Sequence, residues 1–264
     1  MKQVALVASS NALAKKKRKK IARLVERLEE VGLVSHVSNH IFTTEGLLGA
    51  SPEERAQAVN EFYRRGNLEH IFDVSGGELA NEILDLLDYE LIKNTDTTYW
   101  GYSDVTTILN AIYTKTGKSS VLYQIRYMKH TSMKKLFDFK YDFVQGKSLD
   151  GIVIGGNIRC FLKLAGTEYM PDFTDKILFL ESYSGNKAKL RTFFSQLGQL
   201  GAFDKISGLI LGTFTELEAA DEGEFVIDLA QKYLKNRPIV KTKQIGHQKK
   251  SRAIKIGEKI NLHR

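Results

Sequence analysis

Residues 97–116 read TTYWGYSDVTTILNAIYTKT, and this stretch joins two different patterns. Residues 97–102 are rich in β-branched and aromatic side chains, which is typical of a strand. Apolar residues then recur at helical spacing from Val105 to Thr116. The sequence therefore predicts that a strand runs directly into a helix here.

The same alternation continues on both sides of this stretch. Further strands are predicted at Gln3–Ala8, Leu33–Val37, His70–Ser75 and Ser120–Tyr123, and helices at Lys16–Val31, Pro52–Arg64 and Glu78–Leu87. Strands that alternate with helices favour a mostly parallel sheet flanked by helices. We therefore expect residues 1–130 to form an N-terminal α/β domain.

The second part of the chain repeats this organisation on a smaller scale. Residues 131–150 show no clean period, so they are predicted to be a linker. More strands are predicted at Ile152–Ile154, Lys176–Glu181, Gly208–Thr213, Ile239–Thr242 and Ala253–Ile256, and helices at Lys187–Gln199 and Phe225–Lys235. We expect residues 151–264 to form a smaller C-terminal α/β domain, and ligands to bind where parallel strands end.

The composition excludes several classes of protein. Of the 264 residues, 42% are hydrophobic and 27% are charged, which excludes a disordered chain and a collagen-like fibre. The longest apolar runs are far shorter than the roughly 20 residues of a membrane span. The chain begins with a strand-like run rather than with a secretory signal, and Cys160, its single cysteine, cannot form an internal disulfide. These features predict a cytoplasmic protein without a membrane partner.

Basic residues outnumber acidic ones by 39 to 31, which gives a net charge of +8. Much of the excess lies in Lys15–Lys20, directly before Ile21, Leu24 and Leu28, which recur at helical spacing. A run of this kind is most often the solvated face of a helix. A phosphate-binding patch, or a non-catalytic module that binds nucleic acid, stays open as an alternative. We do not expect a nucleic-acid partner.

Ser103 falls at the turn between the predicted strand and the predicted helix. A nucleophile elbow places a serine at such a turn, and Gly101 two positions earlier permits the sharp bend. The full elbow motif has a second glycine where this chain has Val105. The alternative is that Ser103 or Asp104 simply caps the helix.

Three other turns carry groups that could take part in catalysis. The pair Gly76-Gly77 lets backbone N–H groups approach a ligand, or it forms a tight turn and nothing more. Glu181 follows four apolar residues, so its charge either has a partner or ends the strand in water. His247 follows Gly246 in a loop. Neither an HExxH motif nor paired cysteines are present, so no metal or other cofactor is expected.

Blocks of residues along the chain are similar to those of a known family. They are Ser75-Gly76-Gly77, Gly101-Tyr102-Ser103-Asp104, Gly155-Gly156-Asn157, Leu178-Phe179-Leu180-Glu181 and Gly246-His247. On these residues the chain resembles the LD-carboxypeptidase family of serine peptidases, which includes the microcin C immunity proteins. The similarity extends over nearly the whole chain.

The resemblance implies a serine hydrolase with a Ser-Glu-His triad in the cleft between the two domains. It makes Ser103 the nucleophile, His247 the general base and Glu181 the acid that orients the base. A base is needed because a serine hydroxyl is a weak nucleophile until its proton is removed.

Acyl transfer also needs donors for the oxyanion. We expect these to be the backbone N–H groups of Gly77 and Asp104. Gly76 and Tyr102 are expected to contact the substrate, which is a small peptide.

The resemblance implies two kinds of substrate and a homodimer. The carboxypeptidases of the family release D-Ala from cytoplasmic murein tetrapeptides, whereas the immunity branch cleaves aminoacyl- or peptidyl-nucleotides. Glu78 stands where Tyr-Gly is usual in the family, so the choice of substrate stays open. A terminal carboxylate would need a cationic partner. The candidates for that partner are Arg126, Lys129 and Lys249.

Overall fold

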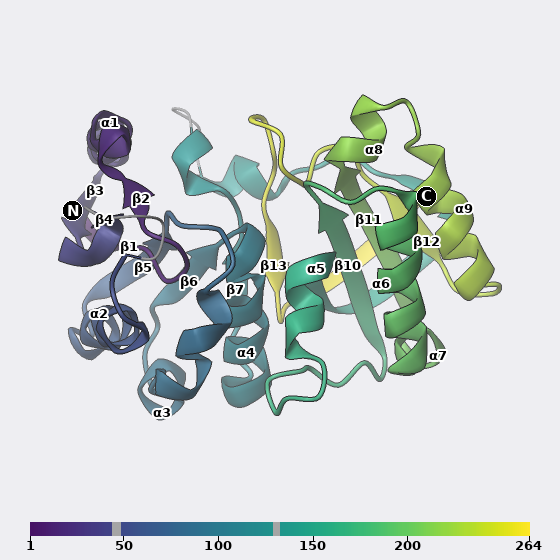
Figure 1. The fold of residues 1–264 in the computed structure, drawn as a ribbon, viewed down its shortest axis with the longest axis horizontal. Helices are drawn as coiled ribbons and strands as arrows, with labels where there is room; N and C mark the ends of the chain where they lie inside the picture. The colour runs from purple at the N-terminus through teal and green to yellow at the C-terminus, as the bar shows by residue number, and fades with distance from the viewer. Residues whose placement is uncertain (44–48, 129–132) are drawn as a thin grey trace.

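Two six-stranded sheets lie side by side along the long axis of the molecule (Figure 1). The computed structural model describes residues 1–43, 49–128 and 133–264. The first sheet contains β1 (Lys2–Val7), β3 (Leu33–Val37), β5 (Leu68–Asp73), β6 (Thr98–Gly101), β7 (Ser120–Leu122) and β13 (Ile254–Ile256). Its order is β13-β7-β6-β5-β1-β3, and every pair except β13–β7 is parallel.

The second sheet has a parallel centre with an antiparallel strand at each edge. Its strands are β8 (Asp142–Gln145), β9 (Ser148–Asn157), β10 (Lys176–Ser182), β11 (Gly208–Phe214), β12 (Ile239–Lys241) and β14 (Lys259–His263). They lie in the order β14-β9-β10-β11-β12-β8. A small pair, β2 (Leu13–Ala14) and β4 (Phe42–Thr43), completes the strands that the structure describes. The predicted α/β fold class is confirmed.

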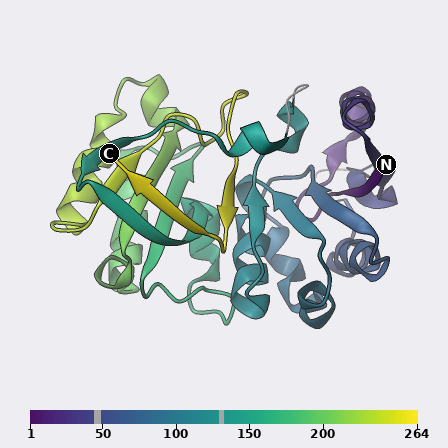
Figure 2. The same ribbon diagram turned by 180° about the vertical axis from the view of Figure 1, so that it is seen from behind.

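Helices flank both sheets (Figures 1 and 2). Those of the first part of the chain are α1 (Arg18–Glu30), α2 (Pro52–Arg64), α3 (Tyr89–Lys93) and α4 (Thr106–Thr116). Those of the second part are α5 (Ile158–Phe161), α6 (Lys187–Gln199), α7 (Ala202–Lys205), α8 (Thr215–Ala219) and α9 (Glu224–Tyr233). The helix predicted at Glu78–Leu87 is instead a 3₁₀ helix at Ala80–Leu86.

The alternation of side chains along β1 explains why helices cover both faces of the first sheet. Successive side chains of a strand point to opposite faces. Ala5 and Val7 belong to the apolar core formed with α2 and α4, whereas Val4 and Leu6 belong to the core formed with α1. All four are buried, so the strand is apolar on both faces.

Local sequence signals set the bounds of α2. The Ser51 hydroxyl accepts a hydrogen bond from the Glu54 backbone N–H at 3.2 Å. The Glu54 carboxylate in turn accepts one from the Ser51 N–H at 2.8 Å. This reciprocal capping box, with Pro52 at the first helical position, begins the helix at the predicted residue.

The path of the chain between the sheets differs from the simple order that the sequence predicts. Strand β8 lies within residues 131–150, which were expected to form a linker. The strand predicted at Ala253–Ile256 forms as β13, but it pairs antiparallel with β7 of the first sheet. Figure 1 shows β13 between β7 and β10. Its apolar residues Ile254 and Ile256 are buried at this junction, where β7 would otherwise have an open edge.

The side chain of Asn110 on α4 joins the two sheets. Its Nδ2 donates to the Gly155 carbonyl of β9 at 2.8 Å, and its Oδ1 accepts from the Gly155 N–H at 2.9 Å. Asn110 is fully buried, so these bonds have no competition from water. No helix within residues 1–43, 49–128 and 133–264 combines the length and apolar character of a membrane span.

Replacing Asn110 with Leu should destabilise the fold. The substitution keeps the volume but leaves the buried Gly155 N–H and carbonyl groups without partners, which costs about 2–4 kcal/mol. Urea unfolding followed by circular dichroism measures the loss. The matched control, Asn67→Leu, alters an exposed residue and should change stability by about 0.5 kcal/mol or less. A loss below about 1 kcal/mol for Asn110→Leu would contradict the role of this contact.

Candidate active site

Ser103, His247 and Glu181 form a continuous chain of hydrogen-bonding groups. Ser103 follows β6, Glu181 lies at the end of β10, and His247 lies in the loop between β12 and β13. The Ser103 Oγ atom is 3.2 Å from Nε2 of His247. Nδ1 of His247 is 2.7 Å from Oε2 of Glu181. The structure thus brings together three residues that are far apart in the sequence.

Ser103 adopts the backbone conformation of a nucleophile elbow. Its φ angle is 56°, a left-handed conformation that is rare for residues other than glycine. A Cβ atom at Gly101 would lie 2.3 Å from the Val105 side chain, so only glycine fits there. Val105, which stands where the full motif has glycine, is completely buried against this turn. The departure from the motif therefore leaves the elbow intact.

The His247 ring is fixed by its loop and by two aromatic neighbours. Gly246 has a φ angle of 154°, and a Cβ there would lie 1.7 Å from Oγ1 of Thr213 on β11. The ring centroids of Tyr102 and Tyr183 are 4.5 Å and 5.1 Å from that of His247. The imidazole keeps a side-chain exposure of 13%, which leaves it accessible to a ligand.

Glu181 is fully buried, and each of its carboxylate oxygens has a partner. Oε2 faces His247, and Oε1 accepts a hydrogen bond from Nδ2 of Asn157 at 3.0 Å. Asn157 lies beside Glu181 because β9 and β10 pair in parallel with these residues in register. Of the two alternatives for Glu181, the structure shows the paired one. The sequence analysis assigned no role to Asn157. The signal that could have identified it is its position directly after the glycine pair Gly155-Gly156.

The glycine pair lies against Ser103. A Cβ on Gly76 would be 3.8 Å from that of Ser103, and Gly77 has a φ angle of 138°. Both glycines line the cavity that also contains Ser103 and His247. In the described parts of the chain, the N–H groups of Gly77 and Asp104 have no hydrogen-bond acceptor. Gly77 lines the cavity, whereas Asp104 is fully buried and is not among the described residues that line it. Tyr102 is buried against His247, and the described residues that line the cavity do not include it.

The buried carboxylate of Asp73 holds the start of the glycine turn. It accepts hydrogen bonds from the backbone N–H groups of Ser9 and Ser75, at 3.1 Å and 2.8 Å, and from the Tyr99 hydroxyl at 2.8 Å. Burial raises the pKa of Asp73, and these donors oppose that rise. Asp73 thus ties the turn after β5 to the turn after β1.

The side chain of Asp104 points away from the cavity into a second buried network. It accepts hydrogen bonds from the Ser10 hydroxyl at 2.7 Å and from the Ala80 N–H at 2.8 Å, and it pairs with Nζ of Lys163 at 2.6 Å. Lys163 also donates to the Glu78 carbonyl at 2.7 Å. Lys163, which the sequence patterns did not single out, therefore links the elbow to the glycine turn.

The cavity at Ser103 has a volume of about 760 Å³ and several cationic side chains. Lys17, Arg126, Arg159 and Lys189 line it. Arg159 already pairs with Glu78. Of the three cations predicted for a substrate carboxylate, Arg126 lines this cavity, Lys249 lines an adjoining groove, and Lys129 lies outside the described residues.

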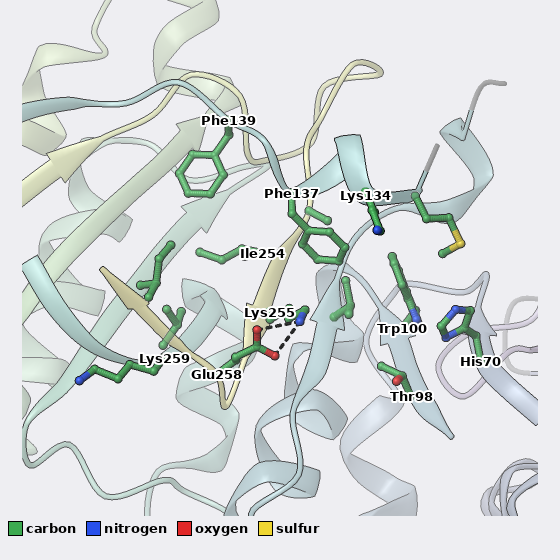
Figure 3. Close-up of a pocket in the computed structure, with 15 residues that line it drawn as sticks. His70, Thr98, Trp100, Lys134, Phe137, Phe139, Ile254, Lys255, Glu258 and Lys259 are labelled. Atoms are coloured by element: carbon green, nitrogen blue, oxygen red, sulfur yellow. Dashed lines mark hydrogen bonds and ion pairs between the residues drawn. The ribbon is translucent and has the colours of Figure 1, made fainter. Parts of the chain in front are cut away.

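A second cavity, of about 520 Å³, is mainly apolar and lies over one face of the first sheet (Figure 3). Trp100 and Phe137 line it, and its Lys255 pairs with Glu258 at 2.7 Å. Ser103, Glu181 and His247 do not line it. No cluster of three or more His, Cys, Asp or Glu that could hold a metal occurs in residues 1–43, 49–128 and 133–264.

Two family models together match most of the chain. Residues 4–123 match the LD-carboxypeptidase N-terminal domain, and residues 150–262 match the LD-carboxypeptidase C-terminal domain. The chain belongs to the LD-carboxypeptidase family. The resemblance predicted from the sequence blocks is confirmed.

Individual members of the LD-carboxypeptidase family are distant relatives of this chain. The "Probable murein peptide carboxypeptidase" of Bacillus subtilis is 25% identical over 93% of this chain and 84% of its own length. The structure of the microcin C7 self-immunity protein MccF in complex with aspartyl sulfamoyl adenosine superimposes with a TM-score of 0.87 at 21% identity, covering 99% of this chain and 93% of that one. The muramoyltetrapeptide carboxypeptidase of Oxalobacter formigenes gives 0.82 at 19% identity, covering 99% and 95%. These structures share the fold.

Replacing Lys163 with Met should destabilise the fold, because it leaves the buried Asp104 carboxylate without its cation. Breaking such a pair costs about 3 kcal/mol or more. A double-mutant cycle with Asp104→Asn, measured by urea unfolding, should give a coupling of about 2 kcal/mol. The matched control is Lys115→Met, which breaks an exposed pair with Glu168 and should cost less than about 1 kcal/mol. Additive effects of the two changes would contradict the pairing.

Proposed function

We propose that this protein is a serine-type carboxypeptidase that hydrolyses the bond to a terminal D-Ala in murein peptides. The observation that carries the proposal is the hydrogen-bonded chain from Ser103 through His247 to Glu181 at a polar cavity. Membership of the LD-carboxypeptidase family supports the same reaction class.

In this mechanism His247 takes the proton of the Ser103 hydroxyl as the oxygen attacks the scissile carbonyl carbon. The Nδ1–H of His247 donates to Glu181, which fixes the tautomer with Nε2 free to act as the base. Glu181 stabilises the imidazolium that forms, and His247 then protonates the leaving amine. A water molecule then attacks the acyl-enzyme carbonyl as His247 takes its proton, and His247 returns that proton to the Ser103 oxygen as the acid product leaves.

The tetrahedral oxyanion would be stabilised by the N–H groups of Gly77 and Asp104. Neither amide has an acceptor among the described residues, and the Asp73 and Asp104–Lys163 networks hold their turns in place before substrate arrives. Preorganised donors stabilise developing charge without a cost of reorganisation at the moment of reaction. Gly76 lies beside Ser103, where a side chain would narrow the approach of the substrate.

A second candidate is hydrolysis of an aminoacyl- or peptidyl-nucleotide. The basic lining of the cavity, from Lys17, Arg126 and Lys189, favours an anionic substrate. The fold is also that of the microcin C7 self-immunity protein, whose structure contains aspartyl sulfamoyl adenosine. Turnover of a murein tetrapeptide and of an aminoacyl-sulfamoyl adenosine, measured side by side, separates the two candidates. The homodimer and the cytoplasmic location stay predictions.

Replacing Ser103 with Ala should abolish turnover of the tetrapeptide and leave the circular dichroism spectrum unchanged. Loss of a triad nucleophile lowers kcat by about 10⁶. Liberated D-Ala is quantified by a coupled oxidase assay. Ser195→Ala, on the exposed side of α6, is the matched control and should retain activity. Full turnover by the Ser103→Ala variant would exclude the proposed nucleophile.

A fluorophosphonate probe provides an independent measurement on the same residue. It should label the unaltered protein at Ser103 and should fail to label the Ser103→Ala variant. Burial raises the pKa of the Cys160 thiol, so this residue should not compete for the reagent.

Replacing Glu181 with Gln should lower kcat by about 10³–10⁴ because the amide favours the wrong tautomer of His247. Asn157 remains able to donate to the retained carbonyl oxygen, so stability should change little. Steady-state kinetics and urea unfolding give the two readouts. A decrease in kcat of less than about tenfold would argue against the orienting role of Glu181.

A further inference from the structure

The cavity of about 520 Å³ drawn in Figure 3 has no part in the proposed reaction. Trp100 of β6 and Val121 of β7 line it from the first sheet, and Phe137 and Phe139 add two aromatic rings. Helices α2 and α4 cover the opposite face of that sheet, so the face with the cavity is the one seen from behind in Figure 2. We call this space the apolar cavity.

Two buried polar atoms at the apolar cavity have no partner. Nε1 of Trp100 and Nδ1 of His70 form no hydrogen bond with any described residue, although Trp100 is only 3% exposed. Both side chains line the cavity, and Figure 3 shows them at the same end of it as Thr98. Buried polar atoms without a partner are rare in native proteins, so each calls for a cause. A polar group of a ligand in the cavity can supply the missing partner.

Aromatic rings dominate the apolar part of the lining. The Trp100 ring lies 5.3 Å from that of His70, 5.4 Å from that of Phe72 and 5.9 Å from that of Phe137, measured between centroids. Aromatic pairs in tilted or offset arrangements gain about 0.5–1.5 kcal/mol beyond the area that they bury. The lining therefore favours a ligand with a planar aromatic body.

The lysines of the apolar cavity outnumber its acids. Lys134, Lys255 and Lys259 line it, together with a single acidic residue, Glu258. Lys255 pairs with Glu258 at 2.7 Å, and Lys259 pairs with Asp150 at 3.0 Å. Lys134 is exposed and forms no ion pair within the described part of the chain. Its ammonium group is therefore available to an anion.

The position of Lys134 relates this cation to the aromatic lining. In Figure 3 the end of its side chain lies between Phe137 and Trp100. A ligand whose ring packs on these two residues thus has a cation within reach of one end. Small-molecule sites typically combine such an apolar lining with a few polar groups that fix the orientation of the ligand.

We propose that the apolar cavity is a second binding site, separate from the active site, for a small aromatic carboxylate. The ring of the ligand packs against Trp100 and Phe137, and its carboxylate pairs with Lys134. The volume of about 520 Å³ lies within the range of small-molecule sites. Val153 of β9 and Ile254 of β13 line the cavity from different sheets, so the ligand contacts both halves of the molecule.

The first test uses Trp100 as the reporter, because it is the only tryptophan of the chain. Dansylglycine is an aromatic carboxylate whose absorption overlaps tryptophan emission, so bound probe quenches Trp100. We expect saturable quenching, with dansylamide, which lacks the carboxylate, binding about tenfold more weakly. Absence of saturable quenching, or equal affinities of the two probes, would contradict the proposal.

The second test examines the contact with the carboxylate. Lys134→Gln should weaken the binding of dansylglycine by about tenfold and change that of dansylamide by about twofold or less. The matched control is Lys135→Gln, which removes the same charge from the neighbouring exposed residue, outside the cavity. It should change both affinities by about twofold or less. Equal effects of the two variants would remove Lys134 from the site.

The third test locates the bound probe. Thr98→Phe places a ring in the cavity and should abolish quenching by dansylglycine while the circular dichroism spectrum is unchanged. Thr192→Phe, at an exposed position of α6, is the matched control and should bind the probe normally. Arg126→Gln alters a cation that lines the Ser103 cavity and not this one, so binding should persist. Binding by Thr98→Phe, or its loss in Arg126→Gln, would place the probe elsewhere and overturn the proposal.

Sedimentation velocity decides whether a second copy of the chain covers this face instead. Thr98→Phe and the unaltered protein should have the same oligomeric state. A change from dimer to monomer in the variant would assign the face to a subunit interface and overturn the ligand site. None of these measurements depends on turnover, so their outcome is independent of the proposed function.

Discussion

The contact between the buried Glu181 carboxylate and His247 is the constraint on which the rest of the site depends. Glu181 and His247 come from the part of the chain that builds the second sheet, whereas Ser103 comes from the first. The imidazole can reach the serine only while the two sheets keep their relative position. The Asn110–Gly155 hydrogen bonds hold that position, as does β13, which the chain adds to the edge of the first sheet after it leaves the second. In the proposed mechanism, proton transfer from Ser103 to His247 therefore depends on how the two sheets pack together.

The buried carboxylates of Asp73 and Asp104 hold the turns around Ser103. Asp73 draws the turn after β5 toward Ser9, and Asp104 draws the 3₁₀ helix at Ala80–Leu86 toward the elbow. Each carboxylate is surrounded by donors, which offsets the cost of its removal from water. The strained backbone of Ser103 persists because these networks over-determine the turn around it. In the proposed mechanism, this rigidity keeps Ser103 in position for attack on a carbonyl group.

Much of this arrangement could be predicted from the sequence, and the reasons for the exceptions are physical. The strand at Leu33–Val37 and the helices at Pro52–Arg64 and Lys187–Gln199 were predicted with the bounds observed, because caps and periodicity are local signals. The residues of the serine–histidine–glutamate chain were identified from the resemblance. Lys163 was missed because a lysine in a short helical turn has no signal until its partner is known. The pairing of β13 with β7 was also missed, because strand neighbours are set by tertiary packing rather than by periodicity.

Strand β13 returns the chain from the second sheet to the first. After leaving β12 in the second sheet, the chain passes through the loop of His247 and then returns to the edge of the first sheet. His247 therefore lies in a loop whose two ends are held in different sheets, β12 in the second and β13 in the first. If the two sheets moved apart, this loop would shift and the distance between His247 Nε2 and Ser103 Oγ would increase. The first sheet is completed only when Ile254–Ile256 add β13 to its edge at β7.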